Sequence, residues 1–278
     1  MKNFLIPVDF SDVSYTAAQY ALDMAAHVRA EKVIFYHSFA HRPEDGFDED
    51  AGGYEQTTLR HLRKMASRLH MPSASLFIDG IVYLADGRPL RQGVEAIVNR
   101  HAVSLIVMGI AGLSDIENTL VGRNTMAVAE SGVAPLLIVP RDHNFKPINK
   151  VVYATDLKNV THITPAASLI RLASQLNAET HIVHVDAATQ GQTPDKILAK
   201  QEILHMLEPL RPIFEVVSEP ADKAEGIFEY VKNHQIDLIL MASRNYGFFE
   251  RLFRSSVSKK LLNIADVPVV LLKNRPVA

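Results

Sequence analysis

The sequence contains no cysteine among its 278 residues. This absence excludes disulfide bonds, thiolate catalysis and cysteine-based metal sites, and it is compatible with a reducing compartment. Long apolar runs are lacking as well, because no stretch approaches the roughly 20 apolar residues of a membrane-spanning helix. Residues 1–9 have a strand pattern instead of a signal-peptide layout. We therefore expect a cytoplasmic protein without a membrane partner.

The chain also lacks a strong excess of charge of either sign. Its 29 basic and 31 acidic side chains give a formal net charge of −2. Such a balance provides no general attraction to nucleic acid or to an acidic membrane surface, so we expect no nucleic-acid partner. The 47% of hydrophobic residues and 22% of charged ones are typical of a globular protein with a full core.

Signatures of catalysis and metal binding are absent too. The sequence has neither a serine elbow nor a GxxxxGK[ST] phosphate loop, and it offers no pair of carboxylates in a defined frame. Its 12 histidines are scattered. The close pair His181 and His184 lies three residues apart on an expected strand, which points the two rings to opposite faces. We therefore assign no catalytic residue and no metal ligand.

What the chain does contain is a regular alternation of short apolar runs and helical patterns. The apolar runs hardly alternate with polar residues, which favours parallel strands that are covered by helices on both faces. In the first half the expected strands are 4–8, 32–37, 75–81, 104–108 and 136–139, and the expected helices are 17–25, 59–69, 93–101 and 119–131. An acidic stretch at 41–54 is expected to be a surface loop.

The same order of elements begins again after residue 149, with a strand at 151–156 and a helix at 165–176. Asp9 matches Asp156 at an offset of 147 residues, whereas Ser104 matches Asp237 at an offset of 133. The acidic loop of the first half accounts for the difference. We therefore predict two tandem α/β domains, 1–145 and 146–278, each with an open, mostly parallel five-stranded sheet that has helices on both faces.

The most informative segment follows the strand at 104–108. Gly109, Gly112 and Gly122 surround the entry into a helix, where backbone can approach a ligand and free N–H groups can bind phosphate oxygens. Asp9 ends the first strand, at the sheet edge where open α/β folds bind ligands. The glycines are also explained as simple turns, and Asp9 as a cap of the following helix.

With these residues the chain resembles the universal stress protein family over both halves. The resemblance rests on Pro7-Val8-Asp9, on His37 at the end of the second strand, and on a spaced glycine pattern that ends in Ser or Thr. Gly109, Gly112 and Gly122 match the glycines of that pattern. The resemblance implies two tandem Rossmann-like domains of the adenine nucleotide α-hydrolase type, packed as a pseudo-dimer through their last strands.

The resemblance also implies a ligand, ATP or AMP with or without Mg²⁺, and its contact residues. These are Pro7, Asp9, Met108, Gly109, Gly112, Gly122, Arg123 and Asn124. Asp9 would face the adenine and ribose, Met108 and Gly109 would lie along the nucleotide, and the last four would surround the phosphates. Arg123 stands where the family has Ser or Thr, so it either pairs with a phosphate or fills the site.

The second half keeps the aspartate and loses the glycines. Ala242, Asn245 and Ser255 stand at the three glycine positions, while Asp156 matches Asp9. Side chains at those positions obstruct a close approach of the backbone to a ligand. We expect the second domain not to bind ATP in the usual way.

Three functions remain open on the sequence. The first is a stress-responsive regulatory protein that binds ATP or a related adenine nucleotide through its first domain. The second is a nucleotide-independent interaction or scaffold module with decayed sites, which acts through a regulatory protein partner or a further homodimer. The third is a slow nucleotide hydrolase, for which the sequence supplies no catalytic group.

Overall fold

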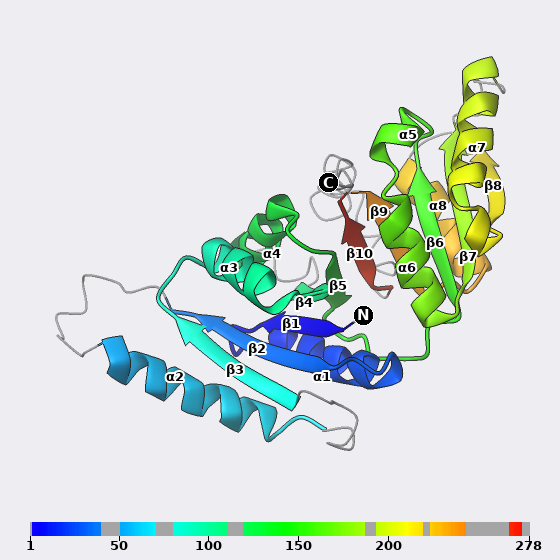
Figure 1. Cartoon of the computed structure of the whole chain (residues 1–278). Coiled ribbons are helices and arrows are strands. Elements are labelled where there is room, and N and C mark those ends of the chain that lie inside the picture. The colour runs from blue at the N-terminus through cyan, green and yellow to red at the C-terminus, as the bar shows by residue number, and fades with distance from the viewer. Residues whose placement is uncertain are drawn as a thin grey trace. The chain divides into compact units, whose positions relative to one another are not determined.

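The computed structural model describes residues 2–39, 51–70, 80–110, 119–186, 193–218, 223–242 and 267–273. The chain divides into two compact units, Met1–Phe145 and Lys146–Ala278. Both units are α/β, with the strands of a sheet between layers of helices (Figure 1). Within the described ranges, no helix is long and apolar enough to cross a membrane.

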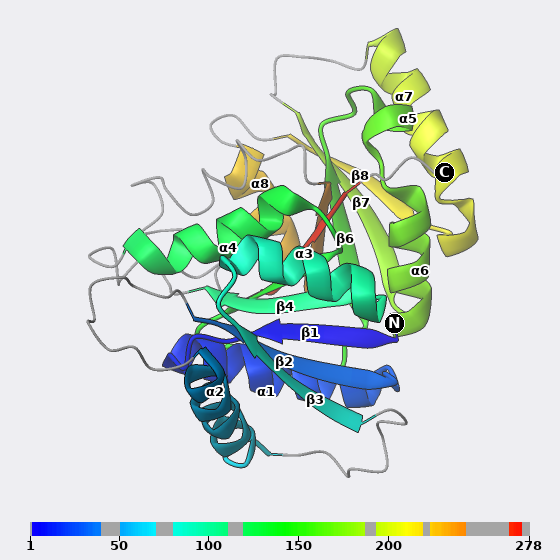
Figure 2. The same ribbon diagram turned by 60° about the vertical axis from the view of Figure 1, so that its left-hand side comes forward.

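The first unit contains a parallel sheet in the order β3-β2-β1-β4-β5. The strands are β1 Asn3–Pro7, β2 Lys32–Ser38, β3 Gly80–Asp86, β4 Leu105–Ile110 and β5 Leu136–Pro140. The helices are α1 Asp12–His27, α2 Ala51–Ala66, α3 Leu90–His101 and α4 Thr119–Ser131. Helices α1 and α2 cover one face of this sheet and α3 and α4 the other (Figure 2).

The second unit repeats this topology, with strand order β10-β9-β6-β7-β8 and parallel pairing. The strands are β6 Lys150–Thr155, β7 Glu179–Asp186, β8 Ile213–Ser218, β9 Leu238–Ala242 and β10 Val269–Leu272. The helices are α5 Val160–Ile163, α6 Ala166–Leu176, α7 Pro194–Met206, the 3₁₀ turn η4 Glu208–Leu210 and α8 Lys223–Asn233. The predicted fold class is confirmed, and the packing of the two halves as a pseudo-dimer stays a prediction.

The core of each sheet follows from its continuous apolar strands. Phe4, Leu5 and Ile6 of β1 are fully buried, and so are Val151 and Val152 of β6. A strand that is buried on both faces needs a helical layer on each side, which is what the βαβ connections supply. The first strand of each unit accordingly lies inside its sheet, between β2 and β4 or between β7 and β9.

Two sequence expectations differ in position from the described elements. The third described strand is β3, Gly80–Asp86, which shares residues 80 and 81 with the expected strand at 75–81 and continues to Asp86. Gly80 has a φ of 76°, which glycine adopts without strain. Helix α2 begins at Ala51, inside the stretch 41–54 that was expected to be a loop. Residues 40–50 and 71–79 lie outside the described residues.

Candidate functional site

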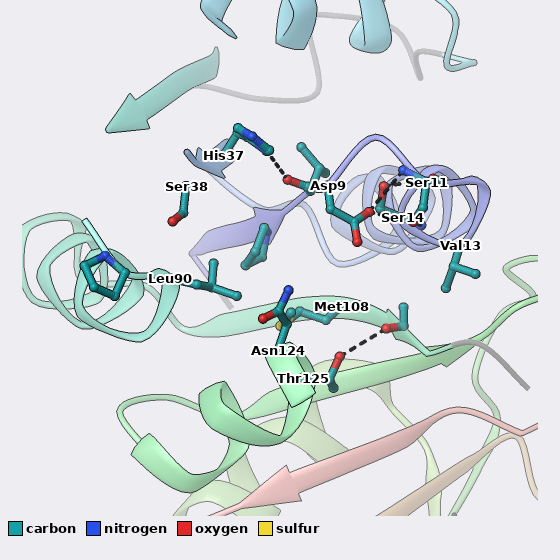
Figure 3. A pocket seen from close by; sticks show the side chains of 14 residues that line it. Asp9, Ser11, Val13, Ser14, His37, Ser38, Leu90, Met108, Asn124 and Thr125 are labelled. Atoms are coloured by element: carbon teal, nitrogen blue, oxygen red, sulfur yellow. Dashed lines mark hydrogen bonds between the residues drawn. The ribbon is translucent and has the colours of Figure 1, made fainter. Parts of the chain in front are cut away.

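A pocket of about 270 Å³ lies in the first unit, at the edge where its parallel strands end. Figure 3 shows side chains from several elements converging on it. The described lining residues come from β1, β2, β4, α1, α3, α4 and the adjoining turns: Pro7, Val8, Asp9, Ser11, Val13, Ser14, His37, Ser38, Pro89, Leu90, Met108, Gly109, Asn124 and Thr125. The pocket thus lies at the edge where open α/β sheets bind ligands.

Asp9 is held in place by the turn that leads into α1. Its Oδ1 accepts hydrogen bonds from the backbone N–H of Ser11 at 3.0 Å and from the Ser11 hydroxyl at 2.5 Å. Partial burial raises the pKa of Asp9, but the bonds from Ser11 and Ser14 outweigh it, so the pKa lies below its ordinary value. The carboxylate is therefore ionised at neutral pH and is an acceptor of hydrogen bonds.

The cap of α1 is Ser11 and not Asp9. The Ser11 side chain accepts a hydrogen bond from the Ser14 backbone N–H at 3.2 Å, and its backbone is extended, as an N-cap requires. Between Asp9 and Ser11, Phe10 has a φ of 65°, a left-handed conformation that a non-glycine residue rarely adopts. Asp9 therefore orders a tight turn and leaves the helix cap to its neighbour.

Gly109 is explained by packing between elements. A Cβ at this position would lie 2.5 Å from the carbonyl oxygen of Val13 and 2.6 Å from its Cγ1. Only glycine lets the end of β4 approach the first turn of α1 this closely. This glycine is thus required by the fold, whether or not a ligand approaches its backbone.

Helix α4 reaches the same edge through two adjacent residues of opposite character. Thr125 is buried, and its hydroxyl donates a hydrogen bond to the Gly109 carbonyl at 3.3 Å. Asn124 is exposed, and its side chain extends into the pocket beside Met108 (Figure 3). The hydrogen bond of Thr125 therefore joins this turn of α4 to β4 near the pocket.

Strand β2 contributes lining residues that were not predicted as contacts. The Nδ1 of His37 donates a hydrogen bond to the Val8 carbonyl at 2.7 Å, and the ring centroid lies 4.7 Å from that of Phe10. Ser38 also lines the pocket, and its hydroxyl donates to the Arg88 carbonyl at 2.6 Å. Their position at the end of a strand that neighbours β1 was the signal that would have indicated them.

The structure brings together five of the eight residues that were predicted to contact a ligand. These are Pro7, Asp9, Met108, Gly109 and Asn124. Gly122 and Arg123 belong to α4, but nothing beyond their place in this helix is described, and Gly112 lies outside the described residues. Within the part of the chain that is described, no group of three His, Asp or Glu side chains is placed to hold a metal ion.

The corresponding edge of the second unit has the same turn but a different surface. Asp156 accepts a hydrogen bond from the Lys158 backbone N–H at 3.0 Å, and Leu157 between them has a φ of 57°. His184 donates from Nδ1 to the Thr155 carbonyl at 3.0 Å and is only 3% exposed. The aspartate turn and the histidine bond of the first unit are thus repeated in the second, where the histidine is buried.

Comparison with known proteins identifies the family. The model of the universal stress protein family matches residues 1–140 and again residues 147–273. The chain belongs to this family. The predicted resemblance is thereby confirmed, and so is the tandem arrangement of two universal stress protein domains.

Individual universal stress proteins are similar to one half or to the whole of the chain. One from Methanocaldococcus jannaschii is 28% identical over 148 residues, which cover 50% of this chain and 82% of that protein. The crystal structure of one from Archaeoglobus fulgidus has a TM-score of 0.59 at 17% identity and covers 98% of both chains. A putative member from Pseudomonas aeruginosa has a TM-score of 0.51 at 12% identity, covering 98% of this chain and 93% of that one. The two structures support the fold alone.

Proposed function

We propose that this universal stress protein is a stress-responsive regulatory protein of the cytoplasm that binds ATP or a related adenine nucleotide through its first domain, residues 1–145. One observation carries the proposal. Five residues that the family's nucleotide motif assigns to the ligand, between Pro7 and Asn124 in the sequence, line one pocket at the ligand-binding edge of the first sheet.

The chemistry of the pocket suits a nucleoside. Val8, Leu90 and Met108 provide apolar surface for the faces of a base. The ionised carboxylate of Asp9 is an acceptor for ribose hydroxyl groups, because a carboxylate has about four acceptor positions and the two bonds from Ser11 are both made to Oδ1. A base and a sugar would therefore each find a matching surface.

Phosphate groups would extend toward the start of α4, where backbone N–H groups and the helix dipole favour negative charge. Arg123, the neighbour of Asn124 in that helix, is the residue that we assign to pairing with a phosphate. With Arg123 in this role, its presence at the family's Ser or Thr position is compatible with nucleotide binding.

We propose that the second domain supports the first instead of binding ATP itself. Ala242 stands where the first domain has Gly109, the next-to-last residue of β4, and Lys158 stands where it has the capping Ser11. His184, which corresponds to the pocket-lining His37, is buried. These differences favour one nucleotide per chain.

Calorimetric titration of the full chain with ATP and with AMP, each with and without Mg²⁺ and after removal of carried-over nucleotide, tests the proposal. We expect about one equivalent to bind. Asp9→Ala should weaken binding about tenfold or more, in line with the loss of a hydrogen bond to a charged group. Asp156→Ala, which removes the corresponding carboxylate of the second domain, is the matched control and should leave affinity unchanged.

The alternatives give different results. Two equivalents per chain would show that the second domain binds as well. No binding of either nucleotide would refute the proposal and favour the nucleotide-independent interaction module. Equal losses of nucleotide affinity in the Asp9→Ala and Asp156→Ala variants would contradict the assignment of the binding site to the first domain.

A further inference from the structure

We propose that Tyr36 and Asp86 are positioning residues of the nucleotide site. The hydrogen bond between their side chains holds the turn from β3 to α3, and this turn carries two lining residues of the pocket, Pro89 and Leu90. Neither Tyr36 nor Asp86 is among the described residues that line the pocket. The inference rests on the proposed nucleotide binding and assigns two residues outside the pocket to the same site.

Tyr36 brings a hydroxyl group from β2 to the end of β3. Its side chain is fully buried, and its hydroxyl donates a hydrogen bond to Oδ1 of Asp86, the last residue of β3, at 2.9 Å. A Cβ on Gly93 of α3 would lie only 1.8 Å from this hydroxyl oxygen, so the glycine leaves the room that the hydroxyl occupies. The bond therefore joins β2 to the end of β3 directly beside α3.

Asp86 connects this bond to the turn that follows it. Its Oδ1 also accepts a hydrogen bond from the backbone N–H of Arg88 at 3.0 Å, and its Oδ2 accepts one from the Arg88 Nε at 2.9 Å. The Arg88 carbonyl in turn accepts a bond from the Ser38 hydroxyl at 2.6 Å. Burial raises the pKa of Asp86, but the bonds from Arg88 and Tyr36 outweigh it, so the pKa lies below its ordinary value. An ionised carboxylate thus accepts bonds from β2 and from the turn at the same time.

The start of α3 depends on this turn. Pro89 is the N-cap of α3, and among the described residues no side chain makes a capping bond there. Leu90 is the first residue of the helix and points toward the pocket (Figure 3). Because a helix start without a side-chain cap is held by its surroundings, the bonds of Asp86 and Arg88 set the position of both lining residues.

The second domain has valines at the two corresponding positions. Because the strands of both sheets pair in the same register, Tyr36 corresponds to Val183 of β7. Asp86 corresponds to Val217 of β8 in the same way. Valine side chains form no hydrogen bonds, yet the second domain has the same sheet topology. The Tyr36–Asp86 bond therefore accompanies the retained nucleotide motif and is not required by the fold.

The test measures the ATP affinity of full-chain variants by calorimetry, with folding checked by circular dichroism. Asp86→Ala and Tyr36→Phe remove the acceptor and the donor of the bond. Each should weaken ATP binding about tenfold, roughly the effect of displacing one apolar side chain from the ligand. Tyr153→Phe, the same change at a buried tyrosine of β6 in the second domain, is the matched control and should leave the affinity unchanged.

A double-mutant cycle separates positioning from a general structural effect. Leu90→Ala alone should also weaken ATP binding about tenfold, because it removes the side chain that the turn positions. If Asp86 acts through Leu90, the double variant of Asp86→Ala and Leu90→Ala should lose about tenfold in total, whereas independent effects would multiply to about a hundredfold.

The inference is wrong if the Asp86→Ala and Tyr36→Phe variants fold and bind ATP as tightly as the unaltered chain, while nucleotide binding then stands. Multiplied losses in the double variant also overturn it. If Asp86→Ala does not fold, Tyr36→Phe, which keeps the buried ring, takes its place in the cycle with Leu90→Ala. If the unaltered chain binds neither ATP nor AMP, the proposed function fails and this inference fails with it.

Discussion

The two domains have the same turn at the end of their first strand, and in the first domain this turn lines the described pocket. Asp9 and Asp156 each accept a hydrogen bond from the backbone N–H two residues later, both at 3.0 Å. The residue between has a positive φ in both cases, Phe10 and Leu157. A contact that persists where the glycine motif has been lost belongs to the fold. The aspartate therefore has a structural role in both domains, and its proposed ligand role in the first is additional.

The domains differ in the element that follows this turn. In the first, Ser11 caps α1, which runs without a break for 16 residues. In the second, α5 ends after four residues, because Pro165 lacks a backbone N–H and forces Thr164 into an extended conformation before α6 begins. The turn after the first strand is therefore the same in both domains, although the helix that follows it differs.

The largest effect should come from the buried histidine of the second domain. His184→Ala removes a side chain that is 3% exposed and leaves the Thr155 carbonyl without its donor, so it should cost roughly 2–4 kcal/mol of stability. His37→Ala, at the half-buried counterpart, should cost about 1 kcal/mol. Urea unfolding followed by circular dichroism measures both, and equal costs would contradict the difference in burial.

A smaller effect is expected where the glycine of the first domain meets α1. Gly109→Ala places a Cβ 2.5 Å from a backbone oxygen and should destabilise the protein by roughly 1–3 kcal/mol through overpacking. Gly53→Ala is the matched control, because its Cβ would meet no atom within 4 Å. A Gly109→Ala variant with the unfolding midpoint of the control would show that the packing explanation is wrong.

The smallest effect concerns the cap that the second domain lacks. Ser11→Ala should cost about 1 kcal/mol at neutral pH, whereas Lys158→Ala should change stability by less than about 0.5 kcal/mol. Ser11 helps to lower the pKa of Asp9 against the opposing effect of burial. The stability that this lowered pKa contributes is fully present above pH 3.8, the ordinary pKa of an aspartate. It is lost as the pH falls through the lowered pKa of Asp9. The loss of unfolding free energy caused by Ser11→Ala should therefore become smaller below pH 3.8, as measured by urea titration. A loss that becomes larger there would contradict this pH dependence.

The order of the elements could be predicted from the sequence because apolar runs and helical spacing are local signals. The strands β1, β2, β4 and β5 of the first domain and β6 of the second were found in this way, and the family resemblance followed from short motifs. The bounds of β3 were predicted only in part, because apolar residues lie on both sides of the Asp-Gly pair at 79–80 and their pattern alone does not show where the strand ends.

The site was only partly predictable, since its side chains meet through contacts between distant segments. Position 109 has no room for a side chain because Val13, 96 residues earlier, lies against it. Leu90 and His37 join the pocket only when the strands and helices that carry them are assembled. The bond of Thr125 to the Gly109 carbonyl, which joins α4 to β4 beside the pocket, is indicated by no sequence pattern.

The central place of β1 in its sheet has a consequence for how the protein is made. The backbone N–H of Asn3 donates to the Ser104 hydroxyl, 101 residues away, and β4 is the second partner of β1. At roughly 5–20 residues per second of synthesis, β1 waits about 5–20 seconds on the ribosome before β4 emerges. During that interval one edge of a strand with three fully buried apolar residues is unpaired, so we expect the nascent first domain to be prone to aggregation until β4 has emerged.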